Sequence, residues 1–197
     1  MHSTTNPARR SALRLVLSFA VVAGAGWLAA AAAGRQAAPT APTPVRGTTV
    51  ILVRHAEKAL DDPKDPGLSP AGAARAQALA RLLAHSGATA LYTSEFRRTR
   101  ETLAPLAKEL GLESHAHPAA DSAGLARTLA ALPPGSVAVV CGHSNTVPAI
   151  AKALGVELRD LDAEGRIAEG SYDRLFSIGL PGCAGGLPGS VEMRYGD

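Results

Sequence analysis

The sequence predicts an α/β domain of three layers, α/β/α, in which a mostly parallel central sheet carries helices on both faces. Two short and largely apolar runs, residues 48–53 and 136–141, are typical of strands that are buried on both faces. Segments with helical periodicity separate the strand-like segments. Such alternation favours parallel strands joined by helical crossovers.

Each further element has local signals of its own. The first helix begins at Leu68-Ser69-Pro70, because Ser69 suits the N-cap and Pro70 the first helical position, and Gly87 closes it. Further helices are expected at residues 99–110, 123–132 and 146–154, and further strands at residues 88–93, 112–115, 174–180 and 190–194. The last two strands alternate polar and apolar residues around a glycine-rich turn.

The first 46 residues have a different composition from the rest. A basic start without acids precedes the apolar or small residues 15–33, which end in Ala31-Ala32-Ala33, and this layout is typical of a secretory signal. The alternative is an uncleaved anchor, since residues 15–33 approach the roughly 20 residues that cross a bilayer. We therefore expect a signal peptide or anchor at residues 1–38, a proline-rich linker at 39–46 and one domain at 47–197.

This division also fixes where the protein is expected to work. A cleaved signal predicts a periplasmic or secreted protein of a bacterial-type cell, and an uncleaved one predicts a domain anchored to the membrane by residues 15–33. Contact with a membrane is expected only in the second case.

The formal charge of +3 does not describe the domain. Five of the 20 basic residues and none of the 17 acidic residues precede Gly47, which leaves 15 basic and 17 acidic residues in the domain. A nearly neutral domain gives no support to a nucleic-acid partner. We expect a monomer.

Polar residues follow three of the expected strands. Arg54-His55 comes after the first strand, Thr93-Ser94 after the second and Gly142-His143-Ser144 after the fourth. Ligands of such sheets bind beyond the carboxyl ends of the strands, so these clusters are expected to meet at one edge. The stretch TSEFRRTRET adds arginines at positions 97, 98 and 100.

This combination of side chains favours chemistry on an anion. Arginine presents a planar fork of donors to phosphate or carboxylate oxygens and stays charged at any working pH. A neutral histidine ring can act as a covalent nucleophile near pH 7. Two arginines beside two histidines therefore indicate a bound anionic group on which an imidazole acts.

Four motifs, in this order, resemble the histidine phosphatase superfamily: VRHAEK, LSPAGAARAQAL, YTSEFRRTRET and VVCGHSNTVPAI. The resemblance extends over most of residues 48–154 and is to the branch that includes cofactor-dependent phosphoglycerate mutases. It implies a phosphoglycerate mutase-like fold and a small, SixA-like member of the branch.

The resemblance also implies a role for each matching residue. His55 would take the phosphoryl group as a phosphohistidine, and Arg54 beside it would bind phosphate. The family's spacing from Ser94 falls on Arg98, rather than on the neighbouring arginines. His143 would donate a hydrogen bond to the phosphoryl oxygens.

The segment after His143 is expected to contribute as well. Ser144 or Asn145 would cap the following helix, whose N-terminal amides would face the anion and help to bind the substrate. Fixed cationic donors suit a transition state that spreads negative charge over three oxygens, so neither a metal nor another cofactor is expected.

The general acid stays open at this stage. Asp121, at the start of an expected helix, is the first candidate, and Glu57 is the second. Glu57 can instead orient a neighbouring cation and so support substrate binding. A phosphohistidine substrate needs no strong acid, because its imidazole leaves easily.

The sequence thus predicts an exported phosphatase that hydrolyses phosphomonoesters or phosphoramidates, with a phosphorylated small molecule or a phosphoprotein as substrate. A mutase-like phosphoryl transferase is an alternative, although little inserted chain is present to enclose a sugar phosphate. A non-catalytic phosphate-binding module at the cell envelope is another. A serine hydrolase is excluded, because Thr146 replaces the second glycine that a nucleophile elbow around Ser144 requires.

Overall fold

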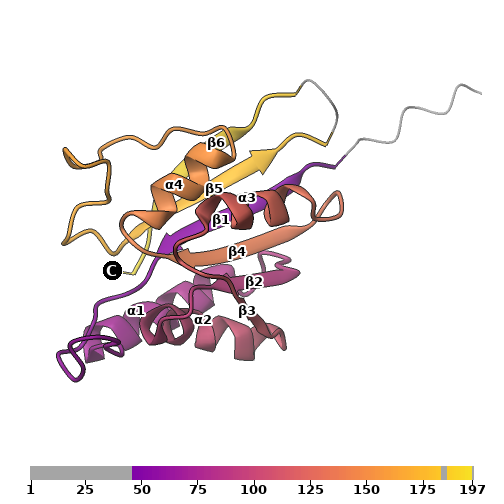
Figure 1. Ribbon diagram of the computed structural model, residues 1–197. Coiled ribbons are helices and arrows are strands. Elements are labelled where there is room, and N and C mark those ends of the chain that lie inside the picture. Colours follow the sequence, from indigo (N-terminus) through magenta and orange to yellow (C-terminus); the bar gives the residue numbers. More distant parts are fainter. Residues whose placement is uncertain (1–45, 183–185, 197) are drawn as a thin grey trace, which may run out of the picture. The chain divides into compact units, whose positions relative to one another are not determined.

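A computed structural model of the 197-residue chain describes residues 46–182 and 186–196 (Figure 1). The expected signal peptide or anchor and all of the linker except Arg46 lie outside these residues. The elements are β1 (Thr48–Arg54), α1 (Pro70–Leu83), β2 (Ala90–Thr93), α2 (Arg97–Leu110), β3 (Ser114–Ala116), α3 (Ser122–Ala130), β4 (Val137–Gly142), α4 (Thr146–Ala153), β5 (Arg174–Leu180) and β6 (Gly189–Arg194).

The strands form one sheet in the order β3-β2-β4-β1-β5-β6. The first four strands of that order are parallel, β5 runs antiparallel to β1, and β6 runs antiparallel to β5. Arg54 at the end of β1 pairs with Gly142 of β4, and Thr93 at the end of β2 pairs with Cys141 of β4. The mostly parallel sheet predicted from the sequence is confirmed, and the carboxyl ends of three strands coincide.

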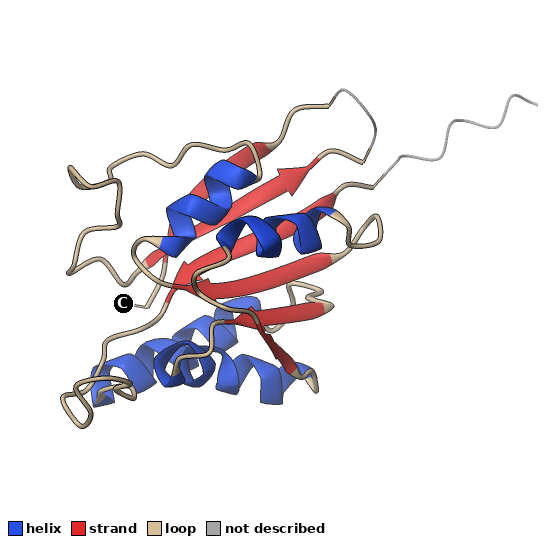
Figure 2. Cartoon of the chain, viewed as in Figure 1, coloured by secondary structure: helices blue, strands red, loops and turns tan. Residues whose placement is uncertain are grey.

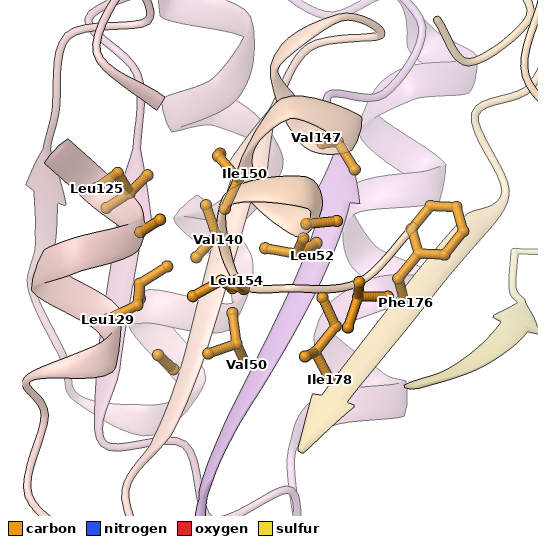
Figure 3. Close-up of a cluster of buried hydrophobic side chains, with 14 of the residues drawn as sticks. Val50, Leu52, Leu125, Leu129, Val140, Val147, Ile150, Leu154, Phe176 and Ile178 are labelled. Atoms are coloured by element: carbon orange, nitrogen blue, oxygen red, sulfur yellow. The ribbon is translucent and has the colours of Figure 1, made fainter. Parts of the chain in front are cut away.

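Helices cover both faces of the sheet, as predicted: α1 and α2 lie on one face, and α3 and α4 on the other (Figure 2). Alternate residues of β1 face the two helical layers. Val50 and Leu52 pack with α3, α4 and Phe176 of β5 (Figure 3), whereas Ile51 and Val53 pack with α1 and α2. A strand buried on both faces needs apolar residues at every position, which explains the unbroken run in the sequence.

Most element boundaries agree with the local signals. Ser69 caps α1, because its Oγ accepts a hydrogen bond of 3.1 Å from the Gly72 amide, and Pro70 is the first helical residue. Gly111 ends α2 with a left-handed φ of 64°. Helix α2 starts at Arg97, two residues earlier than expected, and β3 is shorter and later than expected. None of the helices in residues 46–182 and 186–196 is both long and apolar enough to cross a membrane.

The core of the α3–α4 side gives a test of the packing. Leu52 is fully buried, so Leu52→Ala should lower the free energy of unfolding by about 2–5 kcal/mol through lost burial and the cavity left behind. Leu82→Ala on α1, where the side chain is 51% exposed, is the matched control and should change it by less than about 1 kcal/mol. Denaturant unfolding of both variants measures the difference, and equal losses would contradict the assigned layers.

Candidate active site

A cavity of about 470 Å³ opens where β1, β2 and β4 end. Its wall includes Arg54 and His55 from the end of β1, Arg98 from the first turn of α2, and His143 from the turn after β4. The structure therefore brings together the four residues that the sequence analysis placed at one edge of the sheet. Parallel register achieves this, because it aligns strand ends that are far apart in the chain.

The two histidine rings lie next to each other, edge to face, in the wall of this cavity. The ring centroids of His55 and His143 lie 5.4 Å apart at an angle of 63°, and the residues are only 5% and 7% exposed. Nδ1 of His55 lies 2.8 Å from the carbonyl oxygen of Ala56. A carbonyl only accepts, so Nδ1 carries the proton of the neutral ring and Nε2 keeps its lone pair.

Burial keeps both rings uncharged. Burial, helped by the electrostatic effects of His143, Arg54 and Arg98, lowers the pKa of His55 from 6.5 to about 4 against the opposing hydrogen bond to Ala56. Burial likewise lowers the pKa of His143 to about 4, with Arg98 as the next cause. Near pH 7 the cavity thus holds two neutral imidazoles between permanent cations.

Arg54 is buried, at 3% exposure, and a loop after α4 holds it. Its Nη1 donates to the carbonyl oxygens of Ala168 and Glu169, at 2.8 and 2.9 Å, and its Nη2 donates to the Glu169 carboxylate at 3.1 Å. The guanidinium also lies 4.3 Å from the ring centre of Tyr172. Its Nε has no partner among the described residues.

The sequence analysis missed both Glu169 and Tyr172. They precede β5, and antiparallel pairing places Leu175 of β5 beside Val53 of β1, so the loop before β5 meets the end of β1. The pairing of these strands cannot be read from the local sequence of the loop. A charged segment directly before an apolar strand was the available signal.

The arginines of the TSEFRRTRET stretch point to different places. Arg98 reaches the cavity: its Nη2 lies 3.3 Å from Nδ1 of His143, and its guanidinium lies 4.5 Å from the ring centre of Phe96. Arg97 instead bonds to the carboxylates of Asp61 and Glu101, at 2.9 and 2.6 Å. Arg100 turns back to the carbonyl of Glu95. The structure therefore places Arg98, but not the other two, in the wall of the cavity.

Ser144 and Asn145 also line the cavity, but they do not cap α4 with their side chains. Asn145 occupies the N-cap position with φ −94° and ψ −34°, in the helical region. A residue that caps a helix with its side chain usually has an extended backbone. The predicted side-chain cap by Ser144 or Asn145 is therefore wrong. Thr146 instead accepts a hydrogen bond of 2.8 Å at its Oγ1 from the amide of His143, which fixes the turn that presents the ring.

The two candidate acids are placed outside the cavity wall. The Asp121 carboxylate caps α3 through a bond of 2.8 Å from the Gly124 amide. The Glu57 carboxylate accepts two bonds from Arg75 Nε, at 2.9 and 3.0 Å, and one from its Nη2 at 2.8 Å. Glu57 thus orients the Arg75 guanidinium and does not act as an acid in the cavity, and Arg75 does not line the cavity.

Glu169 is the one carboxylate in the cavity wall as far as the described residues go. Partial burial raises the pKa of Glu169, but the charges of Arg54 and Lys58 outweigh that effect and hold the pKa below its usual value. The group is therefore ionised at neutral pH and holds no proton for a leaving group. In residues 46–182 and 186–196, no three histidine, cysteine, aspartate or glutamate side chains gather in a way that could hold a metal ion.

Comparisons with known proteins agree with this geometry. Residues 50–123 match the family model described as histidine phosphatase superfamily (branch 1). No curated protein matches the chain.

Solved structures of similar fold include three phosphatases. A candidate phosphohistidine phosphatase, SixA, from Agrobacterium tumefaciens is 20% identical, with 75% of this chain and 96% of that one covered at a TM-score of 0.56. The protein histidine phosphatase SixA in complex with tungstate is 19% identical, with 74% and 96% covered at 0.53. A mycobacterial glucosyl-3-phosphoglycerate phosphatase is 18% identical, with 68% and 91% covered at 0.53.

At these identities the solved structures establish the fold, and the family model supplies the link in sequence. The phosphoglycerate mutase-like fold predicted from the four motifs is confirmed. The four motifs and the match over residues 50–123 make this part of the chain similar to the histidine phosphatase superfamily (branch 1), and the solved structures show the same fold.

Proposed function

We propose that the protein hydrolyses phosphomonoesters or phosphoramidates in two steps through a phosphohistidine on His55. One observation carries the proposal: two neutral imidazoles with centroids 5.4 Å apart share a single cavity wall with two guanidinium groups. Such a space suits a phosphoryl group, whose oxygens need fixed donors and whose phosphorus needs a nucleophile.

In the first step, Nε2 of His55 attacks phosphorus with its lone pair. A P–N bond forms to His55 and the bond from phosphorus to the leaving group breaks. Negative charge on the three phosphoryl oxygens is stabilised by Arg54 and Arg98, which are positioned before the reaction, and by a hydrogen bond from His143. In the second step water attacks phosphorus, the bond to Nε2 breaks, and inorganic phosphate leaves.

The described cavity wall holds no protonated carboxylate, and this affects which leaving groups a substrate can have. Glu169 is ionised, so an alkoxide leaving group receives no proton from it. A leaving imidazole or another good leaving group does not need one. This supports the phosphoramidate class more than unactivated phosphomonoesters, and the SixA structures, named as histidine phosphatases, are consistent with it.

His55→Ala should abolish turnover of p-nitrophenyl phosphate and leave the fold intact, because it removes the imidazole whose Nε2 keeps its lone pair free for attack. The wild-type intermediate, trapped with labelled substrate, should be labile in acid and stable in alkali. His85→Ala, at an exposed position after α1, is the matched control and should keep the wild-type rate. An alkali-labile intermediate would overturn the assignment, and phosphate binding without turnover would indicate a binding module.

Arg98→Ala should lower kcat about 100- to 1,000-fold, the usual effect of removing one preorganised donor to the transition state. Arg97→Ala removes the adjacent guanidinium, which faces Asp61 and Glu101 rather than the cavity, and should leave kcat almost unchanged. Steady-state kinetics of the pair measure the effect. Similar rates for both variants would remove Arg98 from the reaction.

His55 should become protonated only at a lower pH than an ordinary histidine. Because burial lowers the pKa of this ring to about 4, Nε2 should keep its lone pair down to about pH 5 and lose it as the pH falls through 4. The stability linked to the neutral ring should be complete above pH 6.5, where the unfolded-state histidine is also neutral, and be lost toward pH 4. NMR titration of the ring measures the midpoint, and a midpoint near 6.5 would contradict the buried neutral nucleophile.

A further inference from the structure

Two buried hydroxyl groups stand behind His143, on the side away from the cavity. Ser94 Oγ lies 2.9 Å from Nε2 of His143 and 2.9 Å from Thr99 Oγ1. Ser94 is 5% exposed and Thr99 is fully buried. Neither lines the cavity, so neither touches a bound phosphoryl group.

The direction of each hydrogen bond follows from what its partners can do. The Arg98 guanidinium has only donors, and its Nη2 lies 3.3 Å from Nδ1 of His143, so Nδ1 accepts. The single proton of the neutral ring is then on Nε2, which donates to Ser94 Oγ. Ser94 in turn donates its own proton to Thr99 Oγ1, and Thr99 donates to the carbonyl oxygen of Phe96 at 2.8 Å.

This arrangement leaves Ser94 with no free capacity. Its oxygen accepts from Nε2 of His143 and, at 3.3 Å, from the amide of Phe96, while its proton lies toward Thr99. If the Ser94 proton pointed toward Nε2 instead, the hydroxyl oxygens of Ser94 and Thr99 would face each other at 2.9 Å with no proton between them. Thr99 could supply that proton only by giving up its hydrogen bond to the Phe96 carbonyl. A buried polar group that loses its hydrogen-bond partner destabilises the protein, so the present direction is favoured.

The position of the ring proton also determines what Nδ1 of His143 can offer to a bound anion. Nδ1 is the nitrogen on the Arg98 side of the ring, and its lone pair accepts from Arg98 in the free protein. When a bound phosphoryl group draws the Arg98 donors to its own oxygens, that lone pair is left facing those oxygens. The oxygens of a phosphoryl dianion are acceptors too, so two acceptors would face each other. One proton between them turns that repulsion into a hydrogen bond.

We propose that Ser94 and Thr99 are positioning residues that lock the ring proton of His143 on Nε2, so that a phosphoryl dianion binds together with one further proton at Nδ1. The inference rests on the proposed role of His143 as a donor to the phosphoryl oxygens. The added proton comes from solvent, and the proton on Nε2 stays in its bond to Ser94.

The charged and titratable groups around His143 are compatible with uptake of a proton only when the anion is present. Arg98 and Arg54 oppose a positive ring in the free protein, Glu95 acts in the opposite direction, and the ring of His55 lies 5.4 Å away. A phosphoryl dianion in the cavity adds two negative charges close to Nδ1 and reverses that balance.

Nitrogen NMR of the full-length protein with labelled histidine tests the lock directly. In the free protein at pH 8, His143 should show a protonated Nε2 and a bare Nδ1. With tungstate, a tetrahedral dianion that carries no proton of its own at pH 8, Nδ1 should gain a proton while Nε2 keeps its own. A bare Nε2 in the tungstate complex, or a proton on Nδ1 in the free protein, would overturn the proposal.

Calorimetry of tungstate binding in buffers of different ionisation enthalpy measures the same event as a count of protons. At pH 8 the wild type should take up about one proton per tungstate. Ser94→Ala removes the lock and lets the ring place its one proton on Nδ1, so the uptake should fall toward zero. Thr99→Ser keeps the hydroxyl and should retain the wild-type uptake.

Equal uptake by wild type and Ser94→Ala would overturn the lock, since a merely structural role for Ser94 predicts no change in proton count. These readouts do not depend on turnover. Proton uptake in a protein that fails to hydrolyse p-nitrophenyl phosphate would support the lock and refute the phosphatase. Hydrolysis without proton uptake would do the reverse.

Discussion

The site depends on a buried cation at the end of a buried strand. Arg54 terminates β1, the strand packed on both faces, and its guanidinium is 3% exposed. A charge removed from water is costly unless it is hydrogen-bonded and paired. Two carbonyl oxygens, one carboxylate and the face of Tyr172 meet that need. The loop before β5 is thereby fixed against the carboxyl end of β1, and the cavity has its wall.

The same burial governs the chemistry of the histidines. Exclusion of water keeps the rings of His55 and His143 neutral, and backbone and side-chain partners then decide which nitrogen of each ring carries the proton. The carbonyl of Ala56 holds the proton of His55 on Nδ1, whereas Arg98 and Ser94 hold the proton of His143 on Nε2. The two histidines are the same type of side chain, but their hydrogen-bonding partners select opposite tautomers.

Much of the fold followed from local patterns because each pattern reflects a local cause. The apolar run of β1 follows from burial on both faces, and Ser69 with Pro70 marks the start of α1 through cap geometry. The edge strand β3 was less well located, because its three exposed residues carry no apolar signal. The convergence of Arg54, His55, Arg98 and His143 was also foreseeable, since parallel strands bring their carboxyl ends to one edge.

By itself the sequence determined the alternating α/β order, the polar clusters at the strand ends and the motifs that resemble the histidine phosphatase superfamily. Only the tertiary structure decided which carboxylate reaches the cavity. Asp121 caps α3, Glu57 binds Arg75, and Glu169 lines the wall because antiparallel β5 returns its loop to the end of β1. Cap preferences and strand patterns act over a few residues, whereas the place of Glu169 in the cavity wall depends on Arg54, which is 115 residues away in the chain.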